Sequence, residues 1–289
     1  MRYSWTAAFL VTLIAVPIAL KFRSPDLRGK SFRIGYEESP PTQFIAADGS
    51  PTGAAIDIVR EAARRRGIKL IWVHSYVGAE QSLSTRETDL WPILSALPWR
   101  TSRFFVSRPY ALVRFWVVVN RGSSLTSSSQ LNGRMIAAKS PGMMVALAKS
   151  YWPDATLRPE PGTAQILQAI CSGEVEGALV AERVEQRIEE NQTGSCAGLS
   201  FRYLPIPNGY GNAGLATARS NSDAIRVAKA LREEISEMAR DGTMTGIYFR
   251  WFHQSNNDAL TIDLMEEARQ RNVLLSAGVG ALFLILGVV

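Results

Sequence analysis

The chain has 289 residues, of which 46% are hydrophobic and 20% are charged, and its formal net charge is +6. These proportions are typical of a globular protein. The run Arg64–Arg66 lies on a predicted helix face, so the basic excess favours a solvated surface over nucleic-acid binding. The two histidines are isolated and the sequence has no Cys-x-x-Cys motif, which argues against a zinc site, and no cofactor is expected.

The first predicted element is an apolar stretch at Trp5–Leu20, and it has two interpretations. Arg2 and the apolar core fit a cleaved signal peptide, but Leu20–Arg23 offers no small-x-small cleavage site. We favour an uncleaved signal anchor over residues 1–23, whose apolar run of roughly 24 Å is slightly short of a ~30 Å hydrocarbon core. The basic residues after the stretch favour the opposite orientation and count against this topology.

Strand and helix signals then alternate along the chain. The predicted strands are Phe32–Tyr36, Lys69–His74, Asp89–Leu94, Ala111–Asn120, Arg134–Ala138, Thr156–Pro159, Gly177–Ala181, Ser200–Ile206 and Gly214–Ala218. The predicted helices are Ala54–Arg66, Gln81–Arg86, Met143–Tyr151, Thr163–Ser172, Glu182–Asn191 and Asp223–Arg240. This alternation indicates βαβ units and mostly parallel sheets. A loop at 121–130 and the stretch Pro205–Gly211 suggest two crossings between two lobes.

The two cysteines, Cys171 and Cys196, flank one of the predicted helices. In an oxidising compartment they would close a disulfide loop around Glu182–Thr193 and stabilise it by a few kcal/mol. Two independent buried thiols are the alternative. We expect the disulfide if the domain is exported.

The last predicted element is a second apolar stretch, Val273–Val289, which carries no charge and follows the charged segment Glu266–Arg271. A buried terminal helix is the alternative, but the stretch has no polar face at helical spacing. Small residues such as Gly280 would let a partner helix approach closely. We expect a transmembrane helix over residues 273–289, joined to the domain by a helical stalk over residues 258–272.

Short motifs occur in a characteristic order between Phe32 and Phe252. They are Phe32-Arg-Ile-Gly, Pro40-Pro41, Asp48-Gly49-x-x-x-Gly53, Ile56-Asp57-Ile58, Asp89-Leu90 before Arg100, Ser107-x-Pro109-Tyr110, Leu131-Asn-Gly-Arg-Met-Ile, Gly173-Glu-Val-Glu-Gly-Ala-Leu and the closing Asp241-Gly-Thr to Trp251-Phe252. Together they resemble the family 3 extracellular solute-binding proteins, as found in sensor histidine kinases and related receptors. The resemblance implies an α/β, two-lobed periplasmic-binding-protein-like fold (Venus flytrap, type II) flanked by N- and C-terminal transmembrane helices. Lobe 1 would take residues 30–118 and 212–254, and lobe 2 residues 119–211.

The same resemblance implies a ligand cleft between the lobes. Arg100 matches the arginine that grips a ligand carboxylate, a task that suits the parallel donors of a guanidinium; an ordinary surface arginine is the alternative. Ser95 matches a small hydroxyl residue beside the carboxylate, and Glu37 an acid that faces a distal cation. Tyr76 matches an aromatic wall, although a core tyrosine is an equal alternative.

The sequence also departs from the family pattern at the cleft. Gly142 and Met143 belong to a loop that usually reads Gly-Thr-Thr, and Glu182 stands one residue beyond the usual acid position, which is Ala181. A buried ammonium group without a partner costs several kcal/mol, so the usual α-amino acid site looks dismantled. Either Glu182 or Glu37 compensates, or the ligand is an organic acid or a less polar molecule, or the cleft binds nothing.

These observations predict a ligand-binding periplasmic sensor module of a transmembrane signalling receptor. It would lie in the bacterial inner membrane with its main domain in the periplasm, and its helices would allow a homodimer. The alternative is a membrane-tethered substrate-binding protein of an ABC-type amino-acid or organic-acid transporter. A remote alternative is a periplasmic dehydratase-like enzyme. No catalytic triad order or phosphate loop is present, so we do not expect an enzyme.

Overall fold

The computed structural model describes residues 29–139, 143–181, 196–253 and 258–286. The predicted signal anchor and the predicted helix Glu182–Asn191 lie outside these residues, as do Gly142 and Glu182.

Most predicted elements are present, within a few residues of the expected bounds. The strands are β1 (Ser31–Tyr36), β2 (Phe44–Ile45), β3 (Pro51–Thr52), β4 (Lys69–His74), β5 (Trp91–Ser95), β6 (Phe104–Val106), β7 (Ala111–Asn120), β8 (Met135–Lys139), β9 (Thr156–Glu160), β10 (Gly177–Ala181) and β11 (Phe201–Ala218). The α-helices are α2 (Ala54–Arg66), α3 (Gly78–Ser84), α4 (Pro98–Thr101), α5 (Met143–Tyr151), α6 (Thr163–Cys171), α8 (Ser222–Arg240), α9 (Thr243–Phe252) and α10 (Asp258–Leu286), with a 3-10 helix η1 at Ser128–Leu131.

The first lobe is built on β1, which pairs in parallel with β4 and makes a parallel bridge from Ile34 to Leu90, just before β5. Helix α2 covers this region and ends, as predicted, at Gly67, whose positive φ of 66° suits a residue without a Cβ. The amide of Gly67 returns to the carbonyls of Ala63 and Arg64 and so satisfies the end of the helix.

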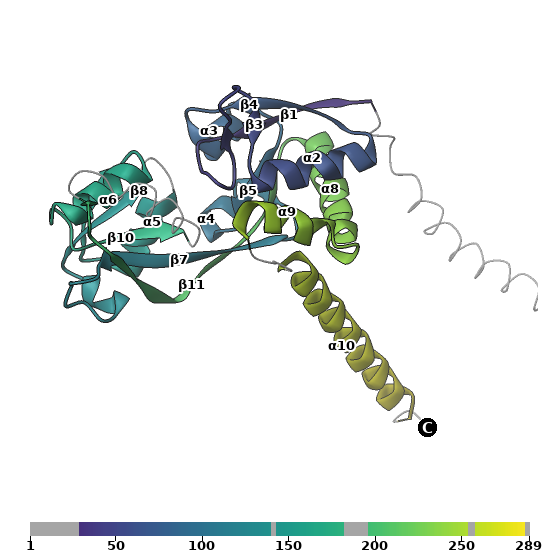
Figure 1. The fold of residues 1–289 in the computed structure, drawn as a ribbon. Coiled ribbons are helices and arrows are strands. Elements are labelled where there is room, and N and C mark those ends of the chain that lie inside the picture. The colour runs from purple at the N-terminus through teal and green to yellow at the C-terminus, as the bar shows by residue number, and fades with distance from the viewer. Residues whose placement is uncertain (1–28, 140–142, 182–195, 254–257, 287–289) are drawn as a thin grey trace, which may run out of the picture.

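The two lobes are joined by the long strands β7 and β11, which run between them (Figure 1). The sheet that they form has the order β5-β11-β7-β10-β8-β9, with β6 also paired to β11. Strands β8, β9 and β10 pair in parallel, but β11 is antiparallel to β5, β6 and β7, and β10 is antiparallel to β7. The prediction of mostly parallel sheets is therefore wrong for the strands that connect the lobes.

Strand β11 is a single element where we predicted two strands. The predicted break at Pro205–Gly211 is instead a shift in the pairing with β7 between Pro205 and Tyr210. Between these pairs β11 advances five positions while β7 advances two, from Trp116 to Arg114, so three extra residues of β11 bulge out of the ladder. Proline has no N–H to give to the ladder, and Asn208 has a positive φ of 54°, which fits this interruption. The backbone thus crosses between the lobes through a bulge that has paired strand on both sides.

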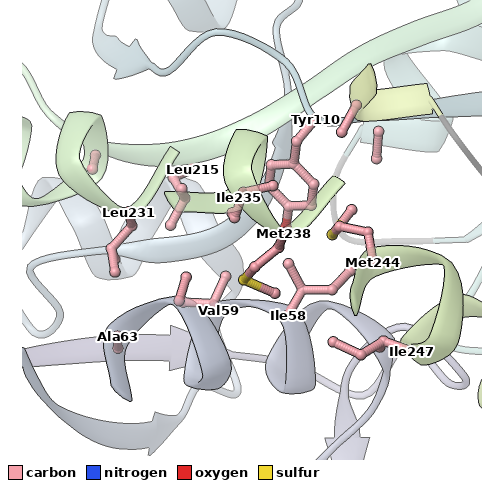
Figure 2. Packing of buried hydrophobic residues seen from close by; sticks show 14 of the residues in the cluster. Ile58, Val59, Ala63, Tyr110, Leu215, Leu231, Ile235, Met238, Met244 and Ile247 are labelled. Atoms are coloured by element: carbon pink, nitrogen blue, oxygen red, sulfur yellow. The ribbon is translucent and has the colours of Figure 1, made fainter. Parts of the chain in front are cut away.

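Each lobe has its own hydrophobic core. In the first, Ile58 and Val59 of α2 meet Ile235 and Met238 of α8, together with residues of α9 and with Leu215 of β11 (Figure 2).

The second core gathers side chains from β7, β8, β10, β11, α5 and η1. It includes Phe115 and Val117 of β7, so this strand joins the second core before the boundary that we predicted after residue 118. A disulfide between Cys171 and Cys196 ties the end of α6 to the start of the segment that leads into β11.

Helix α10 leaves the first lobe and projects away from both lobes (Figure 1). It combines the predicted stalk with the first part of the predicted transmembrane helix, residues 273–289, in one helix of 29 residues. Among the described helices, none is both long enough and apolar enough to span a bilayer.

Candidate functional site

A cavity of about 820 Å³ lies between the lobes and is lined by residues of both. Lobe 1 contributes the segment after β1, the start of α3, the end of β5 and helix α4. Lobe 2 contributes the end of β8, helix α5 and the start of α6. The lining carries acidic and basic side chains, namely Glu37, Glu38, Glu80, Arg100, Arg114 and Lys139. The cavity therefore suits a small molecule with both polar and charged groups.

Arg100 is the most buried charged side chain of this lining, with 7% of its surface exposed. It lies on the short helix α4, which has a proline at its first turn and directly follows β5. Its Nε donates a hydrogen bond to Oε1 of Glu80 at 2.7 Å, and its Nη1 lies 3.3 Å from the Sδ of Met143. The first contact is within lobe 1 and the second reaches across the cleft to lobe 2.

Ser95, Glu37 and Met143 also line the cavity. Ser95 ends β5, is 5% exposed and is paired with Ala213 of β11. Glu37 follows β1 and lies beside Gly78, where a Cβ atom would come within 3.5 Å of its Oε2. Met143 is the first residue of α5.

Tyr76 is placed differently from our expectation. Its side chain is 88% exposed and is not part of the cavity lining. Its ring packs against His74, with the ring centroids 4.5 Å apart. The aromatic residues that line the cavity are instead Trp91, Trp99, Tyr110, Tyr248 and Phe252, and Trp99 is the exposed one at 41%.

Three features of the site were not predicted from the sequence. Glu80 forms the ion pair with Arg100, and Lys139 Nζ donates a hydrogen bond across the cleft to the backbone oxygen of Glu38 at 2.9 Å. Gln43 is 3% exposed, and its Oε1 accepts no hydrogen bond from any residue that the structure describes. Trp99 could have been suspected from its position beside Arg100, whereas Glu80, Lys139 and Gln43 carry no such signal.

One ionisable group next to the cavity lining has a shifted pKa. Burial, followed by the charge of Glu38, raises the pKa of Tyr36 above its usual value, so this phenol stays neutral behind the cleft. Within the described residues, no group of three or more His, Cys, Asp or Glu side chains could hold a metal ion. The arrangement is suited to binding by charge and hydrogen bonding.

Several solved structures share this fold. An ancestral arginine-binding protein bound to glutamine is 20% identical, with a TM-score of 0.65 over 78% of this chain and 98% of its own. A histidine kinase sensor domain with similarity to periplasmic binding proteins is 20% identical, with a TM-score of 0.67 over 79% of this chain and 98% of its own. The substrate-binding protein of an amino acid ABC transporter is also 20% identical, with a TM-score of 0.65 over 78% and 100%. At this identity the likeness establishes the fold alone.

No curated protein matches the chain. The family, however, is shown by a family model. The family model for bacterial extracellular solute-binding proteins, family 3, matches residues 32–254, which includes both lobes and the cavity between them. This protein therefore belongs to the family 3 extracellular solute-binding proteins.

Proposed function

We propose that this protein is the periplasmic sensor module of a transmembrane signalling receptor and that it binds a small carboxylate-bearing solute between its lobes. The observation that carries the binding role is the interlobe cavity with Arg100 buried in its wall and Ser95 beside it. A guanidinium in a partly desolvated cleft is a strong site for a carboxylate because its planar fork offers parallel charge-assisted hydrogen bonds. Membership of a solute-binding family supports the same role.

The ligand that this proposal favours is an amino acid or a similar organic acid. Glu37 lines the same cavity and would face a cationic group of the ligand, as in our sequence interpretation. Two of the similar structures are described as ancestral arginine-binding proteins, one bound to glutamine and one to arginine. Gly142, Met143 and Glu182 stay in the proposed site.

The sensory role is supported by the way α10 is attached. Asp258 in its first turn accepts a hydrogen bond from the backbone N–H of Leu112 at 3.0 Å, and Leu112 lies on β7 and lines the cavity. One turn later, Asp263 is buried against Arg232 of α8. The helix is thus connected both to the lobe 1 core and to a strand that crosses between the lobes. In the proposed receptor, residues 273–289 cross the membrane, residues 258–272 form the stalk, and closure of the lobes shifts the stalk because the ligand binds one state more tightly.

A tethered transport protein is the second candidate, and the similar ABC-transporter binding protein favours it. A transport protein needs the cleft and a tether but no linkage from the cleft to α10. A dehydratase-like enzyme is the third, prompted by the similar ancestral amino acid-binding protein AncCDT-1, described as a precursor of cyclohexadienyl dehydratase. That interpretation needs a general acid in the cleft, where Glu37, Glu38 and Glu80 are the described candidates.

The test is ligand-induced thermal stabilisation of the full chain in detergent micelles, with a panel of L-amino acids and short organic acids. A ligand that binds only the native state raises the melting temperature by an amount that grows with the logarithm of its concentration above Kd. We expect Arg100→Ala to abolish the shift. Arg103→Ala is the matched control, because Arg103 lies three positions on, is exposed, and bonds Ser84 outside the cavity.

The sensory part of the proposal has its own measurement. Amide hydrogen exchange in residues 258–272 should change when the stabilising ligand is added. An unchanged shift in the Arg100→Ala protein would refute the carboxylate site, and ligand binding without any change in exchange over 258–272 would favour the transport role.

A further inference from the structure

The proposed ligand site already contains a carboxylate from the protein itself. Glu80 and Arg100 both line the cavity, and their side chains are in contact through the 2.7 Å bond between Oε1 and Nε. The Arg100 side chain is only 8% exposed, whereas the Glu80 side chain is 35% exposed. The pair therefore joins a buried cation to an acid that still reaches water.

The two contacts of Arg100 occupy both edges of its guanidinium. A carboxylate can bind an arginine side-on, through Nε and Nη2, or end-on, through Nη1 and Nη2. Glu80 accepts a hydrogen bond from Nε and so occupies the side-on edge. The thioether of Met143, a weak acceptor, contacts Nη1 and so occupies part of the end-on edge. A ligand carboxylate that binds through two parallel hydrogen bonds must therefore displace one of these two groups.

We propose that Glu80 is an internal competitor for the carboxylate site, so that a ligand binds Arg100 by displacing the Glu80 side chain toward solvent. This inference rests on the proposed function, because it needs a carboxylate-bearing ligand. In the ligand-free cleft Glu80 compensates the charge of Arg100, which would otherwise be buried without a partner. Because Glu80 is partly hydrated already, its release costs less than the release of a fully buried acid.

The competition has a consequence for specificity. When a carboxylate ligand binds, Arg100 forms an ion pair with the ligand but loses its ion pair with Glu80. The net binding free energy from the carboxylate is therefore smaller than in a site whose arginine has no partner. Glu80 therefore selects against simple monocarboxylates. It favours ligands whose other groups add contacts elsewhere in the cavity, such as an amine facing Glu37.

The test compares Glu80→Gln with the wild-type full chain in detergent micelles, with L-glutamine, L-arginine and sodium formate as carboxylate probes and with agmatine, which is arginine without its carboxylate. Glutamine keeps the size of Glu80 but removes its charge. We expect the variant to bind the carboxylate probes about ten- to hundredfold more tightly, since a hydrogen bond between charged groups no longer opposes them, and to bind agmatine no more tightly. Without ligand, its melting temperature should be lower.

Two further variants keep the test decisive. Glu80→Asp retains the charge but shortens the side chain, so it should bind carboxylates more tightly than the wild type and less tightly than Glu80→Gln. It replaces Glu80→Gln in the test if that variant does not fold. Glu87→Gln is the matched control, since Glu87 lies beyond the same helix, accepts a hydrogen bond from Ser82 and is outside the cavity; its affinities should equal those of the wild type.

The outcomes separate this inference from the proposed function. If Glu80 merely positions Arg100, the variants will bind carboxylates more weakly than the wild type, and the inference is wrong. It is also overturned if no carboxylate probe binds the variants more tightly. If Arg100→Ala abolishes binding while the Glu80 variants gain nothing, the inference fails and the carboxylate site stands. If the Glu80 variants bind carboxylates more tightly but hydrogen exchange in residues 258–272 does not change on ligand binding, Glu80 is a competitor as proposed and the sensory role is wrong.

Discussion

Replacing Asp263 by alanine should strongly destabilise the first lobe. Asp263 of α10 and Arg232 of α8 form an ion pair in which each side chain is 2% exposed, with Nη2 and Oδ1 2.7 Å apart. Arg108 lies 3.3 Å away on the same carboxylate oxygen. Burial lowers the pKa of Arg232, which shows the cost of keeping this cation away from water, and the bond to Asp263 opposes that effect.

The magnitude follows from what Arg232 keeps after the change. It would still donate to the backbone oxygens of Arg108 and Pro109 and to Ser236, but no buried charge would balance it. Removing one partner of a buried pair costs about 3–5 kcal/mol. For a domain of this size each kcal/mol lowers the melting temperature by roughly 2–4 °C, so we expect a decrease of about 10 °C.

The assay is thermal unfolding of the full chain in detergent, followed by the fluorescence of its 7 tryptophans. The exposed pair between Arg240 and Glu267 joins the same two helices, so Glu267→Ala is the matched control, with a cost of less than about 1 kcal/mol. The double variant Arg232→Met with Asp263→Leu should recover most of the lost stability, because it removes both charges from the interior. The reasoning is refuted if Asp263→Ala costs no more than Glu267→Ala.

Two further predictions concern stability. Hydrogen bonds from Thr243 and then Arg65 lower the pKa of Asp241 from 3.8 to about 2, so between these values the unfolded chain binds a proton that the folded chain does not. The stability difference between wild type and Asp241→Asn, less than about 1 kcal/mol at this exposed site, should be complete above about pH 4 and should decline as the pH falls toward 2 in urea titrations. A difference that stays constant from pH 5 to pH 2 would contradict this assignment. Reduction of the Cys171–Cys196 disulfide, which spans a sequence separation of 25, should cost about 3–4 kcal/mol in urea unfolding, and a chain with both cysteines replaced by alanine should be insensitive to reductant. Equal sensitivity of the two chains would exclude this bond as the source of the effect.

The sequence predicted most of the elements because their signals are local. Helix α2 has its apolar residues at helical spacing and a glycine at its end, and its observed bounds, Ala54–Arg66, are those expected. Strand β7 was equally clear as a continuous run of apolar and β-branched residues. The two-lobed fold followed from the order of short motifs, and the family match over residues 32–254 confirms that recognition.

The prediction was least accurate where tertiary pairing decides the structure. A stretch rich in proline and glycine predicts a loop, but β7 pairs with β11 on both sides of it, so the stretch forms a bulge between Pro205 and Tyr210 inside one strand. The antiparallel pairing of these two strands has no local signal either, since it joins residues roughly 80 to 100 positions apart, such as Phe201 with Asn120 and Ala213 with Ala111.

The site shows the same limit at the level of single contacts. Arg100 could be placed at the cleft from its motif, but its partner depends on where α3 begins. We expected a helix over Gln81–Arg86, which leaves Glu80 before its start, whereas α3 covers Gly78–Ser84 and holds Glu80 in its first turn. There the carboxylate meets an arginine 20 positions further on. A buried arginine requires a counter-charge, and from the sequence we expected a ligand carboxylate to supply it, whereas the structure pairs it with an acid of the protein. Only the fold selects Glu80 over Glu37 and Glu38, and that selection decides whether a ligand meets a free cation or one that is already paired.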